Sequence, residues 1–150
     1  MERRARPAIP RAPLFLGLAT LVPFAACAAT SILADDPIIA TWAFTAHAVW
    51  AACALAATGS VHWGVALREG GPPRAYAIGA FVPFLPFLAL SFGGPWGLMA
   101  MGAGFVALLA YEQSGAAAYL PAWYPRLRLW LTGAILICLL VPIYALSREG

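Results

Sequence analysis

Apolar residues along this chain gather into long runs that are separated by short polar breaks. A helix needs about 20 mostly apolar residues to cross the hydrocarbon core of a bilayer, since each residue advances it by about 1.5 Å. Five runs are long enough, and each predicts one membrane-spanning helix: 13–34, 38–67, 74–92, 95–113 and 127–146. The second run exceeds a single crossing, so its helix is expected to tilt or protrude. The pattern predicts an all-α integral membrane bundle of five transmembrane helices.

Composition supports a membrane environment. Hydrophobic residues make up 63% of the chain and charged residues only 10%, whereas a soluble domain has about 25% charged residues. Too few polar side chains remain to cover a water-soluble globule. We therefore expect one transmembrane domain at 13–147, preceded by a basic cytoplasmic segment at 1–12 and followed by a short periplasmic tail at 148–150.

The arginines indicate a direction for the helices. Eight of the nine basic residues fall before the first run or in the breaks on that same side: Arg3, Arg4, Arg6, Arg11, Arg68, Arg74, Arg126 and Arg128. The positive-inside rule places this side in the cytoplasm, which puts the N terminus inside and the C terminus outside. Short arginine clusters at helix ends do not form a nucleic-acid-binding surface. The alanine-rich, lysine-free usage favours a bacterial inner membrane.

Small residues predict how the helices pack. Lipid tails are as apolar as leucine, so helices in a bilayer associate where small residues let their backbones approach. Two runs carry such residues three or four apart, and we expect these two helices at the centre of the bundle. The bulky fifth run is expected to face lipid or a partner protein on much of its surface. The predicted packing residues are Ala48, Ala52, Ala56, Ser60 and Gly64, with Gly97, Ala100, Gly104 and Ala107.

Prolines interrupt three of the predicted spans, at Pro23, at Pro83 with Pro86, and at Pro142. Each proline removes a backbone hydrogen bond and tends to kink its helix, leaving a carbonyl one turn earlier without a partner. Pro83 and Pro86 are therefore candidate ligand contacts.

Aromatic and basic residues predict a belt at the cytoplasmic boundary of the membrane. Tryptophan and tyrosine favour this boundary, and arginine can reach lipid phosphates from it. The segment SGAAAYLPAWYPRLR, residues 114–128, is expected to lie along the interface. The predicted anchoring residues are His62, Trp63, Arg68, Trp123, Tyr124, Arg126, Arg128 and Trp130.

The chain has two histidines, and His47 lies deeper in its span than His62. An ionisable group at depth is a candidate ligand or cofactor contact, and a haem or chlorin could use it where Ala43 leaves room. The alternative is a hydrogen bond to a neighbouring helix. His47 and His62 lie 15 residues apart, about 22 Å along a helix, so they cannot bind one metal ion.

The chain lacks the common catalytic and phosphate-binding motifs, and its cysteines have no metal-binding spacing. Glu112 stands near the inner end of the fourth span, and no acidic residue occupies mid-membrane as a proton-coupled transporter would ordinarily need. We therefore expect no enzyme, no metal site and no bound cofactor.

Three segments carry a family resemblance: LGLATLVPF at 16–24, GSVHWGVAL at 59–67 and LPAWYPRLRLWLT at 120–132. With them the chain resembles the transmembrane protein 69-like members of domain-of-unknown-function family 3429, which are small polytopic membrane proteins. The resemblance implies a helical protein of a bioenergetic inner membrane. It implies no activity or ligand.

These observations leave three functional hypotheses. The first is a non-catalytic accessory, assembly or structural component of a larger membrane complex, with membrane lipids and another integral membrane protein as partners. The second is a small-solute transporter or channel that uses the proline-containing helices and His47. The third is a haem- or chlorin-binding membrane protein.

Overall fold

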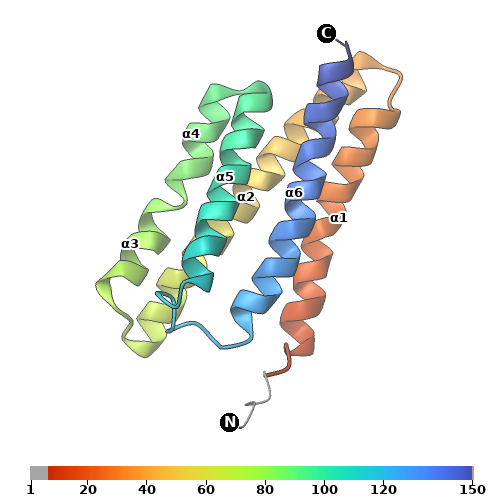
Figure 1. Ribbon diagram of the computed structural model, residues 1–150. Helices are drawn as coiled ribbons and strands as arrows, with labels where there is room; N and C mark the ends of the chain where they lie inside the picture. The colour runs from red at the N-terminus through yellow and green to blue at the C-terminus, as the bar shows by residue number, and fades with distance from the viewer. Residues whose placement is uncertain (1–6, 150) are drawn as a thin grey trace.

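The computed structural model describes residues 7–149, with side chains described up to residue 144, and this part of the chain is a helical bundle (Figure 1). Its helices are α1 (Arg11–Leu33), α2 (Pro37–Glu69), α3 (Pro73–Phe81), α4 (Phe84–Phe92), α5 (Gly94–Gln113) and α6 (Tyr124–Glu149). The predicted basic segment at residues 1–12 lies mostly outside the described residues. The helix α6 continues to Glu149, into the predicted tail at 148–150, and the division of the chain into these segments stays a prediction.

Five spans in the described residues are long and apolar enough to cross a membrane, with α3 and α4 together forming the third, Pro73–Phe92. The five-span all-α architecture is thus confirmed. α1 begins and α6 ends at opposite ends of the bundle (Figure 1). We call the end where α1 begins the inner end and the other the outer end; which of them faces the cytoplasm stays a prediction.

The long helix α2 has well-defined ends. The Asp36 carboxylate accepts a hydrogen bond of 2.8 Å from the backbone N–H of Ile38, and Pro37 occupies the first helical position, where its missing N–H costs nothing. Gly70 ends the helix with φ 68°, a left-handed conformation that favours glycine. The helix is therefore 33 residues long, more than one crossing needs.

Only one of the three proline positions divides its helix. Between α3 and α4 the backbone forms a tight turn, in which the N–H of Leu85 donates a 3.0 Å hydrogen bond to the carbonyl of Val82. This bond supplies a partner for the carbonyl that Pro86 leaves free. Pro23 and Pro142 lie inside the uninterrupted helices α1 and α6.

The helix α2 is the centre of the bundle, since it packs on α1, α3, α4 and α5, while α6 packs on α1 and α5. In Figure 1 the α3–α4 pair forms one edge and α1 the other. In the bulky helix α6, 33% of the apolar span is buried, against 11% of the span in α1, so much of its surface is left outside the bundle, as the sequence predicts.

The packing face of α2 differs from the predicted stripe. Ala52 is buried and Ala48 and Ala56 are half-buried, but Ser60 and Gly64 are exposed. A step of four residues overshoots one turn by about 40°, so a stripe with this spacing rotates off the contact face within a few turns. The face that is buried consists of Ala43, His47, Ala51, Ala52, Leu55, Gly59, His62 and Ala66.

The small residues of α5 also separate into a packed pair and an exposed pair. A Cβ atom on Gly97 would lie 2.6 Å from the carbonyl oxygen of Ala89, and one on Gly104 would lie 2.9 Å from Leu55. These two positions are seven residues apart and share one face, whereas Ala100 and Ala107 are exposed. Gly97 and Gly104 therefore permit close approach, and the two alanines do not take part.

Candidate functional site

A cluster of charged and polar side chains is buried near the inner end of the bundle, centred on Glu112 in the last turn of α5. Glu112 is 3% exposed. Its Oε1 lies 3.3 Å from Nε2 of His62 on α2, and its Oε2 accepts a bond of 3.1 Å from Nε of Arg128 on α6. A buried carboxylate is costly unless it is paired and hydrogen-bonded. The cluster therefore ties three helices together through one carboxylate.

His62 continues the cluster toward the segment that links α5 to α6. Its Nδ1 lies 2.7 Å from the hydroxyl of Tyr119, which lies 3.4 Å from the hydroxyl of Tyr111. A carboxylate can only accept, so Nε2 of His62 donates to Glu112; in the neutral imidazole, Nδ1 then accepts the Tyr119 hydrogen. Both tyrosine rings meet the imidazole edge-on with centroids 5.8 Å apart.

Tyr119 lies outside the spanning helices, and its surroundings favour the protonated phenol. Burial is the main cause that raises its pKa, and the hydrogen bond with Tyr111 adds to the shift. The phenol therefore keeps the hydrogen that it donates to His62. Glu112 also raises the pKa through its negative charge, while Arg74 lowers it.

The α5–α6 link is held in place from several sides. Nε of Arg74 donates a 3.1 Å bond to the carbonyl of Ala116, and the amide of Gln113 donates a 2.9 Å bond to the carbonyl of Pro125. Gly115 has φ 77°, a conformation that a side chain would strain. These contacts hold the link so that the Tyr119 hydroxyl lies within hydrogen-bond distance of His62.

Arg128 has hydrogen-bonding capacity that the described residues do not fill. It is 5% exposed. Its Nη1 donates a 3.4 Å bond to the hydroxyl of Thr58, which donates in turn to the carbonyl of Ala54 at 2.7 Å. Nη2 is buried and has no hydrogen-bond partner among the described residues, as is also true of the Thr132 hydroxyl.

Two of the predicted interface anchors lie instead inside the bundle. His62 is 0% exposed and Arg128 is paired with Glu112. The reason is helical phase: His62 lies on the same face of α2 as Gly59 and Ala66, which face neighbouring helices. Sequence position near a boundary therefore did not give the direction of either side chain.

The other predicted anchors lie at the surface of the bundle or are only partly buried. Arg68, Arg126, Trp63 and Trp130 are exposed, while Trp123 and Tyr124 are half-buried with their rings 6.0 Å apart. Their contact with lipid headgroups stays a prediction.

Glu112 and Thr58 were absent from the predicted site. One signal could have found Glu112: a carboxylate near a span end of so apolar a chain needs an opposite charge, and few basic groups were within reach.

His47 has none of these connections, although it is 0% exposed. Its ring meets Phe24 edge-on with centroids 5.4 Å apart, and neither ring nitrogen has a hydrogen-bond partner among the described residues. The expected bond to a neighbouring helix is therefore not formed there. A porphyrin could reach this ring only by displacing side chains such as Phe24. Pro86 is buried and Pro83 half-buried, both on the α3–α4 edge.

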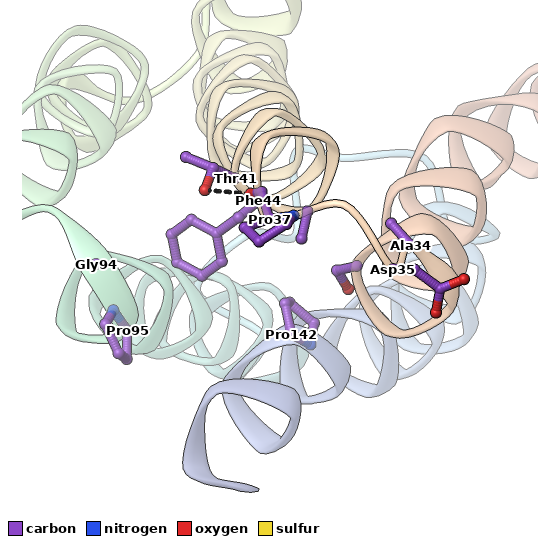
Figure 2. Close-up of a pocket in the computed structure, with 10 residues that line it drawn as sticks. Ala34, Asp35, Pro37, Thr41, Phe44, Gly94, Pro95 and Pro142 are labelled. Carbon is purple, nitrogen blue, oxygen red and sulfur yellow. Dashed lines mark hydrogen bonds between the residues drawn. The ribbon is translucent and has the colours of Figure 1, made fainter. Parts of the chain in front are cut away.

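Two cavities lie between α2 and α6. The outer cavity, about 550 Å³, opens at the outer end; Figure 2 shows Phe44, Pro95 and Pro142 around a common space. The inner cavity, about 340 Å³, lies between α1, α2 and α6, and Arg128 and Thr58 contribute to its wall. The polar cluster therefore borders a space within the bundle.

Five apolar spans around a buried charged cluster define this chain as a polytopic helical membrane protein. Residues 9–144 match the model of a family described as "Protein of unknown function (DUF3429)", and the chain belongs to that family. No curated protein and no solved structure matches it. Family membership is thus confirmed, and the likeness to transmembrane protein 69 stays a prediction.

Proposed function

We propose that the protein is a non-enzymatic accessory, assembly or structural component of a larger complex in a bacterial inner membrane. The observation that supports this proposal is a row of exposed phenylalanines on the α3–α4 edge. Phe81, Phe84, Phe87 and Phe92 are each between 61% and 74% exposed.

Aromatic side chains favour protein contacts as well as lipid. They are enriched in interfaces, where they supply a large rigid contact area. The α3–α4 edge contacts α2 and α5 on its inner side, so the phenylalanine row is free to meet a second membrane protein. The buried cluster suits this role too, because a bundle fixed by an internal ion pair and its hydrogen bonds presents a stable face.

Purification in mild detergent tests the proposal. We expect a stoichiometric membrane protein to accompany the wild-type chain and to be lost when Phe84 and Phe87 are both replaced by leucine, which keeps the surface apolar. The matched control is Phe15→Leu on α1, since Phe15 is 78% exposed on the opposite edge. A chain that purifies alone, or a partner retained equally by all variants, would contradict the proposal.

A second candidate function is transport of a small solute, and the state of His47 favours it. Phe44, which lines the outer cavity, lies one turn before His47 on α2. A solute entering this cavity would approach two ring nitrogens that lack a partner among the described residues. Proteoliposomes loaded with a pH-sensitive dye would show proton-linked flux that His47→Ala reduces. Absence of flux from the wild-type protein would remove this candidate for proton-linked solutes.

A further inference from the structure

The inner cavity combines apolar walls with one incompletely bonded guanidinium. Ala54, Ala57 and Val61 from α2 face Leu131 and Ile135 from α6 across it, and Gly17 of α1 contributes to the third side. Its volume of about 340 Å³ lies within the range of ligand pockets, roughly 300–1,000 Å³. The walls suit a hydrocarbon chain.

Polar side chains from α2 and α6 meet at the edge of this space. Arg128 and Thr58 both line the cavity, and the bond from Arg128 to Thr58 joins the two helices there. Thr58 already gives its hydrogen to Ala54. The unfilled donor is therefore Nη2 of Arg128, which calls for an oxygen acceptor.

Charge decides which acceptor is complementary. No residue that lines the cavity is acidic, and Glu112 meets Arg128 through Nε, outside this lining. A cationic ligand would find no carboxylate here, whereas an anionic oxygen would meet a guanidinium in low-dielectric surroundings, where charge-assisted bonds are strong.

We propose that the inner cavity binds an anionic phospholipid, with a phosphate oxygen accepting a hydrogen bond from Nη2 of Arg128 and an acyl chain lying along Ala54, Leu131 and Ile135 toward the middle of the bilayer. The cavity lies between three membrane-spanning helices, so its natural source of ligands is the bilayer. A phospholipid supplies both features that the cavity matches, a hydrocarbon chain and a negative head. The ligand is thus held within the bundle, unlike lipid attracted to the exposed Arg126.

The proposal separates two arginines that are neighbours in sequence. Arg126 is exposed and would attract any anionic surface, weakly and with screening by salt. Arg128 is buried beside the cavity. Arg126→Gln is therefore the control for charge near the membrane, and it leaves the cavity unchanged.

Native mass spectrometry of the full-length, delipidated protein tests the site with three probes: phosphatidylglycerol, phosphatidylcholine and inorganic phosphate. We expect phosphatidylglycerol to bind about tenfold more tightly than phosphatidylcholine, because both carry the phosphate oxygen but the choline cation cancels the negative charge of the head and finds no carboxylate in the cavity lining. Equal binding of the two lipids would overturn the proposal. Binding of inorganic phosphate as tightly as phosphatidylglycerol would also overturn it, because the acyl chain would then contribute nothing.

Replacing Arg128 disturbs the buried cluster, so the decisive variant fills the cavity instead. Ala57→Trp places an indole in the space and leaves the contact between Glu112 and Arg128 untouched. Phosphatidylglycerol binding should fall about tenfold, whereas Ala100→Trp on the exposed face of α5 and Arg126→Gln should change it less than about twofold. Unchanged binding by Ala57→Trp, with the folded state verified by thermal unfolding, would refute the assignment.

Discussion

The two histidines of α2 share a helix and complete burial, but their surroundings are opposite. His62, near the inner end, contacts Glu112 and Tyr119 through its two ring nitrogens. His47, toward the outer end, meets the ring of Phe24 and has no hydrogen-bond partner among the described residues. Burial alone therefore does not determine the role of a polar residue. That role depends on which partners the neighbouring helices and links supply.

The difference follows from where polar residues enter the bundle. The last turn of α5, the α5–α6 link and the first turn of α6 meet beside His62 and supply a carboxylate, phenols and a guanidinium. Around His47 the neighbouring residues are apolar, as Phe24 and Ala43 illustrate. We infer that polar contacts between helices hold the surroundings of His62, whereas the surroundings of His47 are held mainly by packing.

Removing the carboxylate should produce the largest effect. Glu112→Ala leaves the Arg128 guanidinium buried without its counter-ion, and removing one member of a buried pair costs about 3–5 kcal/mol. Thermal unfolding in detergent would show a strongly lowered midpoint, while Glu69→Ala, at the exposed end of α2, should leave it nearly unchanged. Equal midpoints for the two variants would show that the cluster does not hold the inner end.

Exchanging each histidine for leucine compares the two sites directly. His62→Leu leaves Glu112 and Tyr119 short of a partner, at a cost of about 1–3 kcal/mol for an unsatisfied buried group. His47→Leu removes two buried ring nitrogens that lack partners and should be neutral or slightly stabilising. Unfolding of both variants in one detergent is the measurement. If His47→Leu were as damaging as His62→Leu, His47 would have a stabilising partner beyond its contact with Phe24.

The contrast between the histidines also marks what the sequence could predict. Span lengths are local properties, so the apolar runs led to the correct five-span fold. The cluster is non-local: His62 is 50 positions from Glu112 and 57 from Tyr119. Only the helical phase of His62 and the path of the α5–α6 link bring these groups together. The same error of phase placed the packing stripe on Ser60 and Gly64 instead of on Gly59.

Close backbone packing sets the position of the inner histidine, and Gly59 tests this. A Cβ atom there would lie 2.4 Å from Cγ1 of Val82 at the α3–α4 break. Gly59→Ala should therefore push α2 away and cost about 1–3 kcal/mol, as overpacking does. Gly64→Ala is the matched control, because a Cβ at Gly64 meets nothing within 4 Å. A midpoint lowered only by Gly59→Ala would confirm which face of α2 packs.

The smallest expected effect concerns Tyr119 and appears at high pH. Because its pKa is raised in the folded protein, the stability that the neutral phenol provides is complete below the ordinary tyrosine pKa of about 10 and is lost as pH rises above it. Tyr119→Phe removes the bond to His62 and should cost about 1 kcal/mol at neutral pH. It should also flatten the decline in the unfolding midpoint as pH rises above about 10. An alkaline decline that stays the same in Tyr119→Phe would show that the link carries no stabilising hydrogen bond to His62, and the two histidines would then differ by their contact with Glu112 alone.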